Sequence, residues 1–307
     1  METNNVIKDE IIIIGAGPAG ITAGIYACRA GKSVTIIEKT AVGGQIANTH
    51  LLENYPGFPD GISGFDFAEA LKKQALKFGA KLVNAKITSV ELSGNEKIIH
   101  TTDADYIAKV VIIATGAIPK KLGIEGEKDF IGMGISFCAT CDGMFFKNAE
   151  VAVVGGGDTA LGDAIYLSNI CKKVYLIHRR NEFRASKILV EQAKKKENIE
   201  FLMNKTAEKF FGGFDFEGII LKDKLTGEEN ELKVTGCFEA VGYTPDTELF
   251  SELEKDENGY IIADESTHTN LEAVFVAGDV RTKKLRQVVT ATSDGAVAAN
   301  EAVEFLG

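Results

Sequence analysis

Apolar runs that end in glycine recur along this chain and predict the strands of a parallel sheet. Residues 10–14 read EIIII and lead into the glycine-rich stretch GAGPAG at 15–20. An apolar helical pattern follows, from about residue 19 to 30, and a second β-branched run ends at Glu38. A strand, a glycine turn, a helix and another strand, in this order, predict a βαβ unit.

The same pattern returns about 140 residues later in the chain. The apolar run at 150–154 ends in GGGDTA at 155–160, and a helical pattern and the run KVYLIH at 173–178 follow. Two such units predict an α/β fold with two Rossmann-like, three-layer nucleotide-binding domains.

The first glycine stretch has the spacing Gly-x-Gly-x-x-Gly in the context that dinucleotide binding requires. Gly15 permits the tight turn, Gly17 lets the backbone approach a pyrophosphate at the helix N-terminus, and Gly20 allows close helix packing. Glu38 lies 18 residues past Gly20, where a carboxylate can accept hydrogen bonds from ribose hydroxyls. We expect this unit to bind a nucleotide with a free 2′-hydroxyl.

The second glycine stretch has Gly155, Gly157 and Ala160 at the matching positions. Where the first unit has an acid, this one has the basic stretch 178–180, with Arg184 close behind. Guanidinium groups bind phosphate in a bidentate manner, so the basic stretch favours a nucleotide with a 2′-phosphate. The pattern predicts NADPH, although a solvated charged surface would look similar.

Two later apolar runs predict further strands, which we assign to the first nucleotide-binding unit. The run VVIIATGA at 110–117 predicts a strand that ends in a glycine turn, and the run at 271–280 predicts another that ends in Gly278 and Asp279. Asp279 at a strand end can accept hydrogen bonds from a polyol such as the ribityl chain of a flavin. A helical pattern that begins near Arg286 would direct its N-terminal N–H groups to a reduced flavin ring.

The first domain is therefore expected to be discontinuous. Residues 1–117 and 247–307 would bind FAD, and residues 118–246 would form an inserted NADPH domain that carries a cysteine pair. Each crossing contains a proline, as domain boundaries often do. Within the insert, short apolar and polar runs at 199–241 predict an antiparallel accessory sheet.

Composition narrows the range of partners. The 307 residues carry a formal charge of −10, which argues against a nucleic acid or an anionic membrane as a partner. No apolar run reaches the roughly 18 uninterrupted residues of a membrane-spanning helix. The five cysteines lack the spacing of a disulfide framework, so a reducing, cytoplasmic location is expected.

Cys138 and Cys141 form a Cys-x-x-Cys pair, which alone could be half of a zinc site, a redox couple or an accident of composition. A zinc site needs two more ligands, whereas the other three cysteines are single and the four histidines are scattered. We interpret the pair as a dithiol-disulfide couple that exchanges electrons with a flavin reduced by NADPH. Asp142 follows in a predicted short helix, either as a proton donor and acceptor for the thiol or as an ordinary first-turn acid.

Motifs extend in a fixed order over nearly the whole chain. They are GAGPAG, GGQ, ENYPG, ATGA, CATCDG, GGGDTA, HRR with FRA, VGYTPDT, AGD and RQV. With these motifs the chain resembles the low-molecular-weight, bacterial-type thioredoxin reductases, which are flavoprotein disulfide reductases.

This resemblance implies FAD, NADPH, a thioredoxin substrate, a homodimer and a rotation of the NADPH domain between half-reactions. The FAD contacts that it implies are Gly15, Gly17, Pro18, Ala19, Glu38, Lys39, Gly44, Gln45, Asn54, Thr115, Gly116, Asp279, Arg286, Gln287 and Val288. The NADPH contacts that it implies are Gly155, Gly157, Asp158, Thr159, His178, Arg179, Arg180 and Arg184. Cys141 would face the flavin, Cys138 would attack the thioredoxin disulfide, and Asp142 would complete the catalytic set.

The chain departs from the family pattern at two places. Met133 stands where many relatives carry a basic residue, which bears on the thioredoxin-docking surface. Gly162 and Asp163 stand where relatives usually have two acids. The apolar stretch 144–146 could be a docking patch or could pack in the core.

Two other functions fit parts of the same sequence. One is a related flavin dithiol enzyme that is supplied by ferredoxin or reacts with oxygen, although the ferredoxin-supplied type is expected to lack GGGDTA and HRR. The other is a flavin-binding module without turnover, whose cysteines only sense redox state. Adding NADPH to the protein separates these interpretations. Bleaching of the flavin colour that thioredoxin restores supports the reductase, bleaching that only air discharges favours an oxidase, and no bleaching supports the module.

Overall fold

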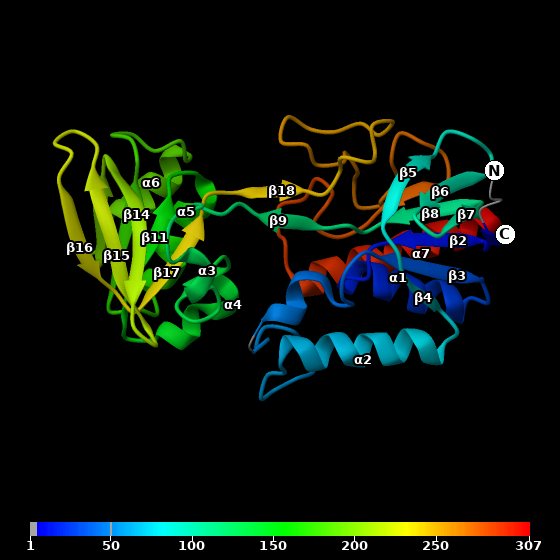
Figure 1. Ribbon diagram of the computed structural model, residues 1–307, viewed down its shortest axis with the longest axis horizontal. Coiled ribbons are helices and arrows are strands. Elements are labelled where there is room, and N and C mark those ends of the chain that lie inside the picture. The colour runs from blue at the N-terminus through cyan, green and yellow to red at the C-terminus, as the bar shows by residue number, and fades with distance from the viewer. Residues whose placement is uncertain (1–4, 50) are drawn as a thin grey trace. The chain divides into compact units, whose positions relative to one another are not determined.

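The computed structural model describes residues 5–49 and 51–307 (Figure 1). Backbone contacts divide the chain into two compact units. Unit 1 consists of Met1–Ile118 and Thr244–Gly307, and unit 2 consists of Pro119–Tyr243. Unit 1 is thus formed by two stretches of sequence with unit 2 inserted between them along the chain.

The centre of unit 1 is a parallel sheet in the order β19-β8-β2-β3-β4. Its strands are β19 (Val274–Val276), β8 (Val110–Ile113), β2 (Ile11–Ile14), β3 (Val34–Glu38) and β4 (Lys81–Asn84). Every residue of β2 and β8 is buried. A parallel sheet covered on both faces needs apolar residues at every position, which explains the unbroken apolar runs in the sequence.

Two layers cover this sheet (Figure 1). On one face Ile11 and Ile13 of β2 pack with the helices, which are α1 (Pro18–Arg29), α2 (Gly64–Lys77) and α7 (Val288–Leu306). On the other face Ile12 and Ile14 pack toward a four-stranded sheet of β1 (Asn5–Lys8), β7 (Ala104–Ala108), β6 (Lys97–Thr101) and β5 (Ile87–Glu91). Alternate side chains of one strand therefore serve two cores.

Unit 2 repeats the three-layer plan. Its parallel sheet has the order β10 (Ile135–Ser136), β17 (Gly236–Ala240), β11 (Glu150–Gly155), β12 (Lys173–His178) and β13 (Ile199–Met203). One core lies under the helices α4 (Ala139–Asp142), α5 (Asp158–Ser168) and α6 (Lys187–Lys194). The other core lies under α3 (Glu127–Phe130) and an antiparallel sheet of β14 (Lys205–Gly212), β15 (Phe216–Asp223) and β16 (Glu229–Lys233).

The predicted antiparallel sheet over 199–241 is wrong at both of its ends. Only β14, β15 and β16 pair in an antiparallel manner. The flanking strands β13 and β17 join the parallel sheet next to β12 and β11 instead. Strand β17 is buried at every residue, which is the property of a central parallel strand rather than of an accessory layer.

The two crossings between the units run as a pair. Strand β9 (Ala117–Pro119) and strand β18 (Tyr243–Pro245) form a two-stranded sheet, labelled in Figure 1. Backbone hydrogen bonds from Lys120 to Gly242 (2.9 Å) and from Asp246 to Gly116 (3.1 Å) continue this pairing. None of the helices within residues 5–49 and 51–307 is both long and apolar enough to cross a membrane.

Candidate active site

The first glycine turn of unit 1 leaves an open space at the start of α1. Gly15 has φ +103°, and a Cβ there would lie 2.4 Å from the carbonyl oxygen of Ala114. A Cβ on Gly20 would lie 1.9 Å from the oxygen of Gly15. By contrast, a Cβ on Gly17 would meet nothing within 4 Å, and no described side chain caps the helix that begins there. The first N–H groups of α1 thus point at a space that suits an anion.

Glu38, at the end of β3, is tied to the glycine turn. One carboxylate oxygen accepts a hydrogen bond from the Ala16 N–H at 2.8 Å, and the other accepts from the N–H and the hydroxyl of Thr40, each at 2.9 Å. The side chain is half-buried. The acid is thereby fixed beside the turn, where a ribose would lie if a nucleotide pyrophosphate met α1.

Residues near the crossing gather around Asp246. The hydroxyl of Thr115 donates to its backbone oxygen at 2.7 Å, and Lys39 forms an ion pair with its carboxylate at 2.5 Å. The amide of Gln45 donates to the oxygen of Ala117. Several of the predicted FAD contacts therefore converge on the ends of β3 and β8.

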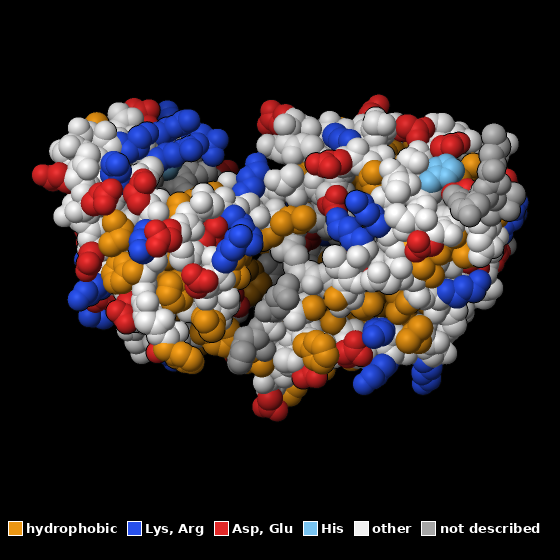
Figure 2. Space-filling view, viewed as in Figure 1, with side chains coloured by type: hydrophobic (Ala, Val, Ile, Leu, Met, Phe, Trp, Pro, Cys, Tyr) orange, Lys and Arg blue, Asp and Glu red, His pale blue; other side chains and the backbone are white. Residues whose placement is uncertain are grey.

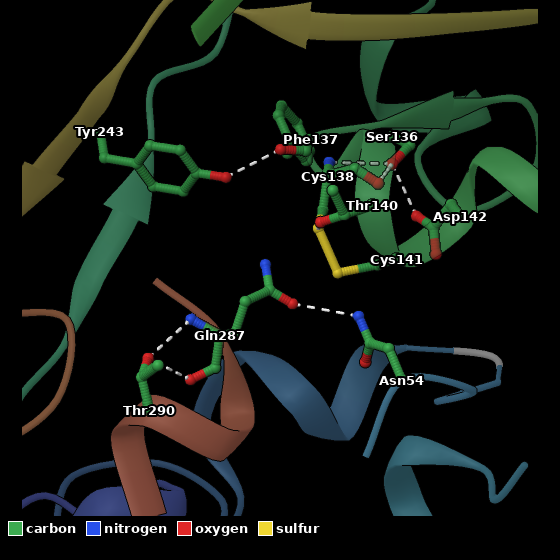
Figure 3. Close-up of a disulfide and its surroundings, with 10 residues drawn as sticks. All are labelled: Asn54, Ser136, Phe137, Cys138, Thr140, Cys141, Asp142, Tyr243, Gln287 and Thr290. Atoms are coloured by element: carbon green, nitrogen blue, oxygen red, sulfur yellow. Dashed lines mark hydrogen bonds between the residues drawn. A yellow bond between two sulfur atoms is a disulfide. The ribbon is translucent and has the colours of Figure 1, made fainter. Parts of the chain in front are cut away.

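A second group lies at the start of α7. The Asn54 amide donates to the side-chain oxygen of Gln287 at 3.1 Å, and Gln287 forms a capping box with Thr290 (Figure 3). The guanidinium of Arg286 lies over the Tyr260 ring, 4.0 Å from its centre. Val288 begins the helix.

Three further predicted contacts of unit 1 involve its glycine turns and α1. Gly44 lies next to the first turn, because a Cβ on it would be 3.4 Å from the Gly17 Cα. Pro18 is the first residue of α1, with a half-buried side chain. The side chain of Ala19 is buried, so only its backbone could reach a ligand.

Asp279 comes after β19 and has a buried oxygen, Oδ1, that has no hydrogen-bond partner among the described residues. Burial raises the pKa of this carboxyl, while Lys283 and Arg286 act in the opposite direction. A buried acceptor without a partner costs free energy unless a ligand supplies a donor. A ligand with hydroxyl groups, such as the ribityl chain of FAD, fits this oxygen.

The second glycine turn, in unit 2, resembles the first. A Cβ on Gly155 would lie 2.5 Å from the oxygen of Ala240, whereas a Cβ on Gly157 would meet nothing within 4 Å. Asp158 begins α5, and its carboxylate accepts the N–H of Ser186 at 2.7 Å. The turn therefore offers the same open helix start as its counterpart in unit 1. Thr159, next along α5, is exposed.

Of the basic stretch 178–180 together with Arg184, one side chain is buried and three are exposed. Arg179, Arg180 and Arg184 are exposed and form no ion pair with the described residues. His178 is buried, stacks on Phe183 and makes a 3.0 Å hydrogen bond to the backbone oxygen of Glu182. Burial lowers the pKa of His178, so the ring supports the turn as a neutral group.

Figure 2 shows lysine and arginine side chains gathered on the surface of unit 2 near α6. The backbone places the basic stretch close to the glycine turn, because the Arg184 N–H donates to the oxygen of Gly156 at 2.8 Å. The arrangement suits a phosphate at the edge of a nucleotide bound by that turn.

Cys138 and Cys141 are joined by a disulfide at the start of α4, with their Cα atoms 5.3 Å apart (Figure 3). Both are half-buried. Ser136 organises this site: its hydroxyl donates to the Asp142 carboxylate at 2.6 Å and accepts the N–H of Cys138 at 3.1 Å. Asp142 is thus held within the disulfide turn by a serine that no motif in the sequence singled out.

Tyr243 links the disulfide turn to a crossing strand. Its hydroxyl donates to the backbone oxygen of Phe137, next to Cys138, at 2.8 Å (Figure 3). Tyr243 was likewise not among the predicted site residues. Tyr243 lies in the motif VGYTPDT, but that motif gives no sign of a hydrogen bond to Phe137, because the two residues meet only through the tertiary fold.

The remaining cysteines are unsuited to exchange. Burial raises the pKa of Cys171 to about 11, and it also raises the pKa of the Cys237 and Cys28 thiols. A thiol reacts as its thiolate, so these three are poor nucleophiles. The disulfide turn is therefore the part of the described chain equipped to take up and pass on two electrons.

Comparisons with known proteins agree with this geometry. The family described as "Pyridine nucleotide-disulphide oxidoreductase" matches residues 9–295. A thioredoxin reductase of Treponema pallidum (strain Nichols) is 45% identical over 297 residues, which cover 97% of each chain.

Solved structures give the same result. A thioredoxin reductase from Streptococcus pyogenes MGAS5005 is similar with a TM-score of 0.92 and 40% identity, over 99% of both chains. A Lactococcus lactis thioredoxin reductase, described as being in the FR conformation, has a TM-score of 0.68 and 39% identity, over 97% of this chain and 99% of its own.

Proposed function

Because the chain belongs to the pyridine nucleotide-disulphide oxidoreductases, and within them to the low-molecular-weight thioredoxin reductases, we propose that it reduces the disulfide of a thioredoxin with electrons from NADPH, through FAD. The Cys138–Cys141 disulfide carries this proposal. It lies in the same unit as a glycine turn with a basic stretch, and the other unit has a turn with an acid.

The residues of unit 1 fit FAD. Gly17 leaves the start of α1 open to the pyrophosphate, Glu38 is fixed where the adenosine ribose would lie, and Asp279 offers a buried oxygen to a ribityl hydroxyl. Bound FAD supplies the step between hydride transfer from a nicotinamide and electron transfer to a disulfide. The chain's part is to hold and orient this group and to exclude water from it.

The residues of unit 2 would hold NADPH. Gly157 leaves the start of α5 open, and the exposed guanidinium groups of Arg179 and Arg180 would bind the 2′-phosphate. Arg179, Arg180 and Arg184 form no ion pair with the described residues, so they can take a dianionic group without first breaking such a contact. A preference for NADPH over NADH is the consequence, because only the 2′-phosphate of NADPH gains these contacts.

The disulfide turn would perform the thiol chemistry. Reduction of the Cys138–Cys141 bond takes two electrons and two protons and gives a dithiol. Asp142, held by Ser136, would move a proton at the Cys141 sulfur. The Cys138 thiolate would then attack the thioredoxin disulfide, and Cys141 would displace the mixed disulfide, which restores the bond and releases dithiol thioredoxin.

This sequence of steps requires the disulfide and the nicotinamide to reach one flavin in turn, so we propose that unit 2 rotates between half-reactions. The chain crosses between the units in the paired strands β9 and β18, which would act as the hinge. A relative described in an FR conformation supports more than one arrangement in this family.

The partner surface and the oligomer also belong to the proposal. Met133, Met144 and Phe145 are about half exposed, at 56%, 49% and 48%, and suit an apolar docking surface for thioredoxin. Tyr26 and Phe305 are exposed on the helices of unit 1 and suit a homodimer interface. Sedimentation measurements on the FAD-loaded protein test the dimer.

NADPH oxidation in the presence of a disulfide thioredoxin tests the proposed function. Wild-type protein should consume NADPH and produce two thioredoxin thiols for each NADPH. Wild-type protein that consumes NADPH equally well with and without thioredoxin in air would instead be an oxidase. Protein that consumes no NADPH under either condition would contradict an enzymatic function.

A further inference from the structure

A buried cluster of charges lies where α7 meets the loop after β19. Asp294, in the second turn of α7, is 5% exposed, and Arg281 is 2% exposed. One Asp294 oxygen, Oδ2, accepts three hydrogen bonds, from the Gly278 N–H at 2.9 Å, from Arg281 Nε at 2.9 Å and from Lys283 Nζ at 2.7 Å. The other oxygen accepts from Arg281 Nη2 at 3.0 Å.

All four contacts join Asp294 to the single loop 278–283, and this loop carries Asp279. Gly278 has φ +81°, and a Cβ on it would lie 2.9 Å from the Ala19 Cβ, so the loop can take this path only with glycine at its start. The loop is therefore clamped from the side of α7, while the Asp279 oxygen Oδ1 stays without a partner among the described residues.

The charges in the cluster do not balance without Asp294. Two cations, Arg281 and Lys283, share its carboxylate, and the only other ion pair of Arg281 in the described chain is a 3.7 Å contact with the almost fully exposed Glu265. Lys283 already acts electrostatically on Asp279. If Asp294 lost its charge, the buried ammonium would need another anion, and the carboxylate of Asp279 in the same loop, which already feels its charge, is the candidate.

We propose that Asp294 is a positioning residue for FAD: it holds the loop 278–283 and keeps Lys283 away from Asp279, so that the Asp279 carboxylate remains available to a ribityl hydroxyl. This proposal rests on the proposed function, since it assumes that unit 1 binds FAD. Asp294 lies in α7, outside the glycine turns, yet it arranges a ligand contact made by Asp279 in the loop before that helix.

Titration of the apoprotein with FAD, followed by flavin fluorescence, tests this role without measuring turnover. The Asp294→Asn variant should bind FAD at least about tenfold more weakly than wild type, because charge-assisted contacts are lost and a competing cation is released. The double variant Asp294→Asn/Lys283→Gln should recover part of that loss, because the competing cation is gone. A purely structural role predicts a further loss in the double variant.

Asp9→Asn is the matched control. The Asp9 side chain is also buried in unit 1, and it accepts hydrogen bonds from Thr35 at 2.6 Å and from Lys81 at 2.8 Å. It precedes β2 and so lies at the amino end of the sheet, whereas the loop 278–283 comes after the carboxyl end of β19. Asp9→Asn should lower thermal stability and leave the FAD dissociation constant within about twofold of wild type.

The outcomes separate the two proposals. If wild-type apoprotein takes up no FAD, the proposed function fails. If wild type binds FAD and Asp294→Asn binds it equally well, or if Asp9→Asn weakens binding as much, the role of Asp294 is overturned. Should Asp294→Asn fail to fold, the Lys283→Gln variant is the test. Its FAD affinity should be two- to fivefold weaker, on the order of one lost hydrogen bond to Asp294. An unchanged affinity would contradict the proposal.

Discussion

The two units of this protein share a glycine turn and differ in the side chains that lie beyond the next strand. In unit 1 the acid Glu38 is half-buried and engaged by the turn itself. In unit 2 the matching place begins with buried His178 and continues with exposed arginines that have no ion pair in the described residues. The same backbone device can thus hold unlike nucleotides, because specificity lies in the side chains outside the turn.

The units also differ in how they treat a buried acid. Asp294 in unit 1 receives four hydrogen bonds, three of them from cationic side chains. Glu239 in unit 2 is buried beside a second acid, Glu127, with which it shares a hydrogen bond. Burial and Glu127 raise the pKa of Glu239 to about 8. Unit 1 therefore stabilises a buried charge with partners, whereas unit 2 keeps its acid protonated near neutral pH.

The largest effect is expected when the Cys138–Cys141 disulfide can no longer form. In Cys141→Ser the disulfide cannot form, so thioredoxin reduction should fall by at least about 10⁴-fold. Reduction of the flavin by NADPH should be retained, because Gly157 and the arginines are untouched. Stopped-flow absorbance and a steady-state thiol assay measure the two steps. Cys28→Ser is the control, and equal losses in both variants would contradict a special role of the pair.

The second largest effect on activity is expected when Arg179 and Arg180 lose their charges. Arg179→Gln/Arg180→Gln removes two charge-assisted contacts of roughly 1.5 kcal/mol each, so kcat/KM for NADPH should fall about 100-fold. The value for NADH should stay unchanged, which distinguishes lost phosphate recognition from a damaged fold. Lys233→Gln, an exposed position at the end of β16 in unit 2, is the control. Equal losses with NADH and NADPH would reject the assignment of this stretch.

A smaller effect is expected at the acid of unit 1. Glu38→Gln keeps one acceptor for the Ala16 N–H but loses the charge that ribose hydroxyls would meet. FAD affinity of the apoprotein should fall about tenfold, or roughly 1.4 kcal/mol, in a fluorescence titration. NADPH binding should not change, since Glu38 belongs to the other unit. If Glu38→Gln weakened NADPH binding and left FAD binding unchanged, our assignment of FAD to the turn of unit 1 would be wrong.

The buried acid of unit 2 should change activity least, and its effect should appear instead as a pH dependence of stability. The folded protein keeps a proton on Glu239 up to about pH 8, whereas the unfolded chain releases it near 4.5, the ordinary value of the side chain. The free energy of unfolding therefore decreases as pH rises between these values, by at most about 1.4 kcal/mol per pH unit from this group.

Denaturant unfolding of Glu239→Gln at several pH values checks this slope. The amide imitates the protonated acid, so the variant should gain stability over wild type as the pH approaches 8. The exposed Glu228→Gln should run parallel to wild type at every pH. A stability difference between Glu239→Gln and wild type that does not change with pH would show that Glu239 keeps no proton in the folded state.

The sequence predicted the parts of this molecule that local patterns encode. Strands β2 and β11, the glycine turns after them and the start of α1 lie where the apolar runs indicate. The disulfide between Cys138 and Cys141 agrees with the interpretation of the pair as a redox couple. These features need only a few consecutive residues to specify their backbone, so they can be read without tertiary contacts.

The parts that were missed depend on tertiary contacts. Strand β17 reads like the antiparallel strands before it, and only its place beside β11 distinguishes it. Ser136 and Asp294 are single polar residues whose partners lie elsewhere in the chain or across a turn. Burial raises the pKa of Asp163 to about 7, which no sequence pattern signals.

The most direct test traces electrons from NADPH through one flavin to the Cys138–Cys141 pair and on to thioredoxin. FAD-loaded protein should be mixed with NADPH in the absence of oxygen and then with disulfide thioredoxin. We predict that NADPH bleaches the yellow flavin absorbance and that thioredoxin restores it. Bleaching that thioredoxin leaves unchanged and that only air reverses would contradict this route for the electrons.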